Sequence, residues 1–176
     1  VHNEEEAVEV IRQTGKLNIP VTYRAAGTSL SGQAISDSVL MVATHEWRKY
    51  TILDDGLKIK LQPGIVGARA NVFLKPFGRK IGPDPASINA AMIGGIASNN
   101  ASGMCCGIDQ NSYKTVSDIR IVFYDGTILN TADDESKKSF QEKHPEIIKE
   151  IEDLRDEIKA NKILLERIKQ KFKIKN

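Results

Sequence analysis

The sequence has little of several residue types that would define a function on their own. Its only two cysteines, Cys105 and Cys106, are neighbours, and adjacent cysteines rarely bridge each other and build no disulfide framework. We therefore expect a reducing, cytoplasmic setting. A zinc or iron–sulfur site needs three or four ligands at suitable spacing, so these cysteines predict no metal centre.

Histidine is also scarce, and the charges nearly balance. The three histidines, His2, His45 and His144, stand apart with no serine or carboxylate at a readable spacing, which gives a hydrolase triad no support. The formal net charge of +2 is too small to indicate a nucleic-acid-binding face. No apolar run approaches the ~20 residues that a membrane span requires, so we expect no spanning segment in this sequence.

The chain does have enough apolar residues to build a core. Of its 176 residues, 40% are hydrophobic and 27% are charged, which fits one ordinary domain or two small lobes around a shared core. The sequence begins at Val1, almost inside a helix signal, and stops at Asn176 without any turn chemistry. From these ends we expect a piece of a longer protein.

Residues 1–46 predict a small parallel α/β lobe. Asn3 followed by Glu6 forms a capping box, which predicts a helix that closes near Gly15. Two β-branched runs follow and are separated by a glycine-containing loop. Helix, strand, loop and strand in this order are typical of a parallel α/β unit.

Residues 47–135 predict a second, larger lobe with a mostly antiparallel sheet. The runs at 50–53 and 57–61 read as strands joined by an Asp-Asp-Gly turn, and those at 116–124 and 127–130 are joined by Asp-Gly. Both turns are hairpin signals. The two lobes together predict an α+β fold class.

Other parts of the chain predict helices and one long loop. A helical stretch is expected at 65–74, whereas residues 78–112 are dense in Gly, Ala, Ser, Asn and Pro, which predicts loop. A loop of this length inside a compact domain is uncommon unless it is functional or disordered.

Residues 136–176 predict a charged helical segment. Apolar residues recur in it on a four–three spacing that is interrupted at Asn161. They are Ile147, Ile151, Leu154, Ile158, Leu165, Ile168 and Phe172. A short coiled coil has this spacing, but the polar break favours one or two amphipathic helices lying on a domain.

The first loop that could carry chemistry is residues 24–33, RAAGTSLSGQ. Its glycines let the backbone approach a ligand closely, and consecutive backbone N–H groups make a nest for an anion. The loop matches neither the GxGxxG of a Rossmann turn nor a Walker A loop. From these residues alone, a flexible linker, a plain surface turn and a phosphate-binding loop all stay open.

The second such segment is residues 83–103, PDPASINAAMIGGIASNNASG. Its small side chains would let the backbone press against a flat or extended ligand, and its asparagines can both donate and accept hydrogen bonds. A buried crossing where larger side chains do not fit is the structural alternative.

Taken in order, these motifs resemble the FAD-binding domain of the vanillyl-alcohol-oxidase-type (PCMH-type) flavoenzymes. The matching segments are 24–32, 62–64, 83–87, 93–100 and 125–126. The sequence is most similar to the FAD-linked D-2-hydroxyacid dehydrogenases of the D-lactate and glycolate types. The stretch NNASGMCCG and residues 111–115 also resemble the large branch in which a flavin domain is fused to an iron–sulfur region.

The resemblance implies a PCMH-type fold and an FAD site built from both segments. The family's first glycine loop holds the pyrophosphate of FAD, and the matching positions are Ala26, Gly27, Thr28, Ser29, Leu30, Ser31 and Gly32. The second segment would lie along the flavin and its phosphates through Pro83, Asp84, Ser87, Gly94, Gly95, Ile96, Asn100 and Ser102. Relatives that bind flavin covalently place a histidine near the first loop, where this chain has Thr28 and Ser29, so the resemblance implies noncovalent FAD.

The activity implied by the resemblance is oxidation of a D-2-hydroxyacid to the 2-oxoacid by hydride transfer to flavin. The family's substrate domain and catalytic residues lie outside this sequence, so we expect the chain alone to be inactive. Its implied partners are that domain and an iron–sulfur region or other electron acceptor. Two alternatives stay open, a non-catalytic nucleotide-binding module and a reductase of the UDP-acetylenolpyruvylglucosamine type. A membrane-peripheral parent enzyme is the alternative to a purely cytoplasmic one.

Overall fold

The computed structural model describes residues 1–43, 45–107 and 109–171, which fall into two compact units. Unit 1 comprises Val1–Ser117 and Tyr124–Gly126, and unit 2 comprises Asp118–Phe123 and Thr127–Asn176. Phe172, the last apolar residue of the predicted helical pattern, lies outside the described residues. The lobe boundaries expected from the sequence stay a prediction.

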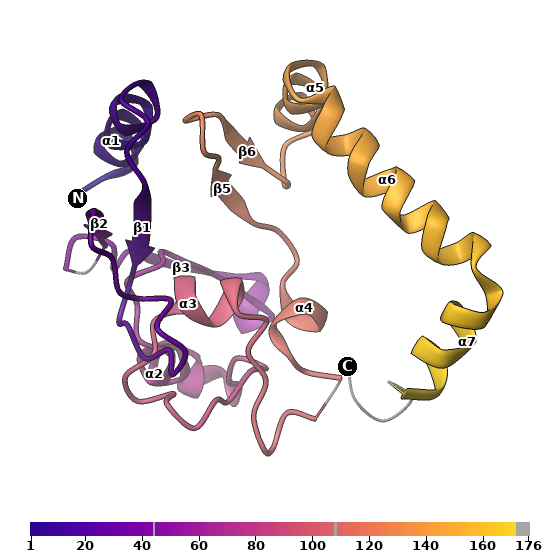
Figure 1. Ribbon diagram of the computed structural model, residues 1–176. Helices are drawn as coiled ribbons and strands as arrows, with labels where there is room; N and C mark the ends of the chain where they lie inside the picture. The colour runs from indigo at the N-terminus through magenta and orange to yellow at the C-terminus, as the bar shows by residue number, and fades with distance from the viewer. Residues whose placement is uncertain (44, 108, 172–176) are drawn as a thin grey trace. The chain divides into compact units, whose positions relative to one another are not determined.

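Unit 1 begins with the predicted helix and parallel strands (Figure 1). Helix α1 (Glu4–Lys16) is capped by Asn3, whose Oδ1 accepts a hydrogen bond from the Glu6 N–H at 2.8 Å. Strand β1 (Val21–Arg24) pairs in parallel with β2 (Val39–Val42). The expected parallel arrangement is therefore confirmed.

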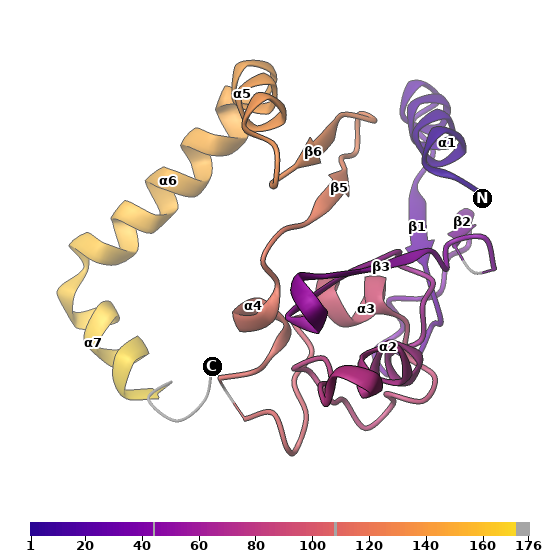
Figure 2. The same cartoon turned by 180° about the vertical axis from the view of Figure 1, so that it is seen from behind.

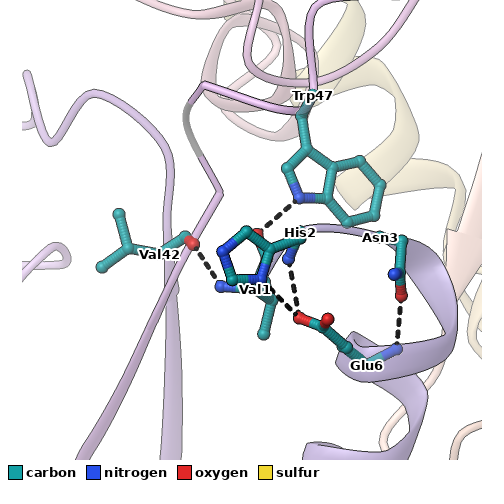
Figure 3. A network of polar contacts seen from close by, with 6 residues as sticks. All are labelled: Val1, His2, Asn3, Glu6, Val42 and Trp47. Carbon is teal, nitrogen blue, oxygen red and sulfur yellow. Dashed lines mark hydrogen bonds and ion pairs between the residues drawn. The ribbon is translucent and has the colours of Figure 1, made fainter.

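The start of the chain is fastened to this α/β part by a polar network (Figure 3). The Val1 nitrogen donates to the carbonyl of Val42 at 3.1 Å, and the indole Nε1 of Trp47 donates to the Val1 carbonyl at 2.9 Å. The Glu6 carboxylate accepts from the His2 N–H at 2.8 Å. Below this network, Ala7, Met41, Ala43 and Trp47 form the first hydrophobic core of unit 1.

A hairpin and a short helix follow. Strand β3 (Tyr50–Leu53) pairs antiparallel with β4 (Lys58–Leu61) across the 3₁₀ turn η1 (Asp54–Gly56). Helix α2 (Gly67–Leu74) runs into η2 (Lys75–Phe77). The Tyr50 ring stacks on Phe73 of α2 at a centroid distance of 3.7 Å, which fixes the hairpin against the helix.

The prediction that residues 78–112 form only loop is wrong in part. The segment contains helix α3 (Ile93–Ser98) and ends at the first residue of α4 (Ser112–Thr115). Two glycines in six residues hide α3 from propensity rules, and the helix is stabilised instead by tertiary contacts. Around it, Ala91, Ile96 and Ala101 form a second hydrophobic core with Ile88 and Ile93 packed against it.

Unit 2 contains one hairpin and three helices among the described residues (Figures 1 and 2). Strand β5 (Arg120–Val122) pairs antiparallel with β6 (Ile128–Asn130). Helices α5 (Asp134–Lys143), α6 (Pro145–Ala160) and α7 (Lys162–Lys171) follow. The interruption predicted at Asn161 is observed between α6 and α7, and Pro145 is the first residue of α6.

The fold class is α+β, as predicted, with the antiparallel strands divided between two separate hairpins. None of the helices described here combines the length and the apolar character needed to cross a membrane.

Candidate functional site

The first loop leaves the carboxyl end of β1 and leads back to β2. It contains two glycines with positive φ, 71° at Gly27 and 79° at Gly32, a conformation that residues with a Cβ disfavour. A Cβ at Gly27 would also lie 3.0 Å from Cδ of Arg24. Position 27 therefore accommodates glycine and resists any larger residue.

The same loop presents a row of backbone donors. Residues 28–31 are exposed, and no N–H group of residues 26–31 donates to another described residue. Leu30 is fully exposed, so its side chain contributes nothing to a core. The Ser29 hydroxyl donates to the side-chain oxygen of Gln33 within the loop. Successive N–H groups without partners form a site for an anion.

Arg24 places a positive charge at the base of this loop. Its side chain folds over Gly27, with Cγ 3.6 Å from the position that a Cβ would take there. Its Nε is buried and has no hydrogen-bond partner among the described residues. Such a group is costly unless an acceptor is supplied, and a bound anion would supply one.

The second segment is held against the rest of unit 1 through α3. The N–H of Ile93 donates to the Ile65 carbonyl at 2.8 Å, and that of Gly94 donates to the Pro63 carbonyl at 3.0 Å. A Cβ at Gly94 would lie 2.7 Å from Cβ of Pro63, so this glycine allows the close approach. Because the Ile65 carbonyl accepts a hydrogen bond from Ile93, α2 begins at Gly67 rather than at the expected residue 65. Gly95, by contrast, faces open space.

The turn after α3 is held by hydrogen bonds to Ser112 and Tyr113. Asn100 has a φ of 44°, and its side-chain oxygen accepts from the Tyr113 N–H at 2.8 Å. Ser112 is buried, and its hydroxyl donates to the carbonyls of Ala101 at 2.9 Å and Ile96 at 3.1 Å. The Ile96 carbonyl thus accepts a hydrogen bond within the fold, and the Ile96 side chain is buried in the second hydrophobic core.

Asp84 clamps the far end of the segment. Its carboxylate accepts hydrogen bonds from the N–H groups of Cys105 and Cys106, each at 3.2 Å. A Cβ at Gly103 would overlap Oδ1 and the carbonyl oxygen of Asp84. The two cysteines therefore make a loop contact with Asp84 through their backbone N–H groups. No group of three or more His, Cys, Asp or Glu side chains that could hold a metal ion occurs among the residues described.

The hydrogen bonds to Asp84 predict a pH-dependent stability. Burial raises the pKa of Asp84, but the hydrogen bonds from Cys105 and Cys106 outweigh it and hold the pKa below its ordinary value. A carboxyl with a lowered folded pKa stabilises the fold above its unfolded pKa of about 3.9 and loses this contribution as the pH falls through the folded value. We expect Asp84→Asn to be less stable than wild type at neutral pH, and the difference to shrink in acid.

Urea unfolding at a series of pH values measures this difference. Asp37→Asn is the matched control, because Asp37 is an exposed carboxylate of unit 1 with no ion pair to a described residue. A difference between Asp84→Asn and wild type that stays constant from neutral pH into acid would contradict the proposed role of the charge.

All the residues predicted to bind cofactor lie in unit 1, but only some of them are free to contact a ligand. The exposed donors of the first loop, Gly95 and Ser102 are open to a ligand. Pro83 and Ile96 are buried, and both carboxylate oxygens of Asp84 are engaged. No hydrogen bond between described residues joins the first loop to the second segment.

Two residues that support the second segment carried no predicted site role. Ser112 and Asn111 are buried at 3% and 2% exposure, and Asn111 caps α4 by accepting from the Lys114 N–H at 3.0 Å. An Asn just before a short helical stretch is a signal for such a cap. No local pattern marks Ser112, whose hydroxyl partners lie 11 and 16 residues away.

The first loop satisfies a simple test for a dinucleotide pyrophosphate such as that of FAD. It offers consecutive free backbone donors, a glycine that lets a ligand approach, and a buried guanidinium nitrogen that lacks an acceptor. Each of these suits a pyrophosphate, whose two phosphates carry one negative charge each.

Comparison with known proteins identifies relatives of this site. A family model described as FAD binding domain matches residues 1–132. The chain is 29% identical over 111 residues to D-2-hydroxyglutarate dehydrogenase of Escherichia coli, covering 62% of the chain and 11% of that protein. It is 32% identical over 104 residues to glycolate oxidase subunit GlcD of E. coli, covering 58% of the chain and 21% of that protein. A mitochondrial D-lactate dehydrogenase [cytochrome] of Saccharomyces cerevisiae is 30% identical over 137 residues, covering 74% of the chain and 23% of that protein.

Solved structures show the same fold. The structure of 6-hydroxy-D-nicotine oxidase from Arthrobacter nicotinovorans superposes with a TM-score of 0.66 at 15% identity, covering 76% of this chain and 29% of that one. Alkyldihydroxyacetonephosphate synthase superposes with a TM-score of 0.63 at 20% identity, covering 78% of this chain and 26% of that one. The chain thus spans less than a third of each of these proteins.

Proposed function

Because this chain belongs to the FAD binding domain family, whose model matches residues 1–132, we propose that it is the FAD-binding part of a D-2-hydroxyacid dehydrogenase. Three relatives whose names specify D-2-hydroxyglutarate, glycolate and D-lactate support this substrate class. The rest of the active site would be supplied from outside these residues.

The proposal rests on the backbone N–H groups of the first loop, because they donate to no other described residue. In this proposal the N–H groups of residues 26–31 bind the pyrophosphate, and Arg24 adds its positive charge beside Gly27. Gly95 and Ser102 are exposed positions of the second segment that would face the cofactor. When bound, FAD accepts hydride from the substrate, and this domain supplies binding and orientation.

Noncovalent attachment is part of the proposal. The first loop contains no histidine or cysteine, and its hydroxyl side chains are suited to hydrogen bonding. Denaturation followed by filtration should therefore release all the flavin from the holoprotein, and flavin retained by the denatured chain would contradict this part.

An FAD titration followed by flavin fluorescence and thermal shift tests the proposal. Saturable binding is expected, with stabilisation of about 2.7 kcal/mol at a hundredfold excess of FAD over Kd. Gly27→Val should weaken binding by roughly a hundredfold, because the new side chain strains a backbone at φ 71° and meets Arg24.

Gly15→Ala is the matched control, since Gly15 lies in α1 with nothing within 4 Å of the new Cβ. It should bind FAD as wild type does. Arg24→Gln is a second probe and should weaken binding while the fold persists. Equal FAD affinity in wild type and Gly27→Val would rule out the first loop as the pyrophosphate site. Preferential binding of another nucleotide would favour a nucleotide-binding module instead.

A further inference from the structure

Helices α6 and α7 of unit 2 carry an apolar face that no described part of unit 2 covers. Ile151 and Leu154 in α6 are 62% and 57% exposed, and Leu164 in α7 is 37% exposed. The half-buried residues Ile147 and Ile148 lie in the first turn of α6, where α5 packs. Both views show α6 continuing beyond α5 with no other element of unit 2 along its length (Figures 1 and 2).

Exposed and half-buried apolar residues together form one stripe on each helix. On α6 the stripe consists of Ile147, Ile151, Leu154 and Ile158, and on α7 of Leu164, Leu165 and Ile168. The four–three spacing places each set on one side of its helix. We call the two stripes together the α6–α7 face. A contiguous exposed apolar face of this kind marks a site of contact with another surface.

The charges on the two helices are opposite in sign. Helix α6 has six acidic and three basic residues, whereas α7 has one acidic and four basic residues. The net charges are therefore −3 and +3. Several of these groups pair locally, such as Lys149 with Asp153 at 2.6 Å and Lys169 with Glu166 at 2.9 Å.

Four charged residues without an ion-pair partner among the described residues are also acidic on α6 and basic on α7. Glu150 and Glu157 on α6 form no ion pair with any residue the structure describes, and the same holds for Lys162 and Arg167 on α7. Glu150 and Glu157 are seven residues apart along one border of the α6 stripe. The acidic border of α6 is thus complementary in charge to a basic helix such as α7.

The chain cannot bring these two surfaces together within one copy. Only Asn161 lies between α6 and α7, whereas an antiparallel pair of helices needs a connection of about 2–5 residues. The acidic border of α6 can therefore reach a basic α7 only on another molecule.

We propose that the α6–α7 face is the interface of a twofold dimer, in which α6 of each copy packs against α7 of its partner. The twofold arrangement uses the same contact twice, so both acidic helices meet basic ones and all four stripes are covered. Opposite charges select this pairing over α6 with α6 or α7 with α7, both of which place like charges together.

Charge reversal on each helix gives a test that only this pairing passes. Variant one is Glu150→Lys with Glu157→Lys, and variant two is Lys162→Glu with Arg167→Glu. The wild-type chain should dimerise in sedimentation equilibrium, and each variant alone should dissociate roughly a hundredfold more readily, because its two helices now carry the same sign.

Mixing the two variants should restore a 1:1 heterodimer. Each α6 then again faces an α7 of opposite charge, so the mixture should sediment as a dimer although neither component does. Circular dichroism of each variant checks that the helices persist. Glu5→Lys with Glu9→Lys is the matched control, because these exposed carboxylates lie on α1 in unit 1, and it should dimerise as wild type does.

Three results would overturn the proposal. They are a wild-type chain that stays monomeric at micromolar concentration, a variant mixture that stays monomeric, and a monomer that instead binds vesicles of anionic phospholipid through α7. None of them depends on flavin binding, so the FAD titration and this experiment can fail independently.

Discussion

Replacing Gly103 by alanine is expected to lower the free energy of unfolding of unit 1 by about 3 kcal/mol. A Cβ at this position would overlap Oδ1 and the carbonyl oxygen of Asp84. These atoms belong partly to the backbone, so a rotamer change cannot relieve the overlap. The chain must separate residues 84 and 103, which breaks the hydrogen bonds from Cys105 and Cys106 to the carboxylate.

Urea unfolding followed by tryptophan fluorescence measures this effect, and Gly95→Ala supplies the control. Gly95 lies inside α3 with nothing within 4 Å of an added Cβ, and alanine is favoured over glycine in a helix by about 0.5–1 kcal/mol. The two substitutions add the same methyl group to the same segment, yet their effects should have opposite signs. A loss below about 1 kcal/mol for Gly103→Ala would show that the Asp84 contact is not tight.

Phe140→Ala is expected to cost about 3–5 kcal/mol and to act on unit 2. Phe140 is 4% exposed, and its ring centroid lies 4.5 Å from that of Phe123 and 4.8 Å from that of His144. Phe123 directly follows β5, Phe140 lies in α5, and His144 lies between α5 and α6. Removing the central ring leaves a cavity that the two remaining rings cannot fill.

Hydrogen exchange resolved along the chain locates the damage. Protection should fall in the β5–β6 hairpin and α5, while α1 and the β1–β2 pair keep theirs. Phe77→Ala is the control, because Phe77 is 41% exposed at the end of η2, and it should cost less. Equal loss of protection in both units would show that they unfold as a single cooperative structure.

Local chemistry explains which elements the sequence predicts well. Asn3 caps α1, Pro145 begins α6, and Asn161 separates α6 from α7, each through a property of a few neighbouring residues. The hairpin turn at Gly56 is likewise a local signal. Rules that depend on neighbouring residues can therefore place these boundaries from the sequence alone.

Helix α3 and the Asp84 clamp depend on distant residues instead. The Ile-Gly-Gly-Ile-Ala-Ser stretch is helical because Pro63 and Ile65 hold its first turn and Ile96 enters a core. Asp84 finds its partners 21 and 22 residues away. In the candidate site, the glycine motif predicted the first loop from the sequence. The burial of the Arg24 Nε depends on how the chain folds, so only the structure could reveal it.

The indole of Trp47 has a practical consequence beyond its hydrogen bond to Val1. It is the only tryptophan of the chain, and it is 9% exposed in the first core of unit 1. Its emission is thus a built-in optical probe of that unit, whereas far-ultraviolet dichroism reports the helices of both units. In a single melt, a dichroism transition that does not coincide with the tryptophan transition would therefore report the separate unfolding of unit 2, and any flavin that docks in unit 1 gains an internal energy-transfer donor.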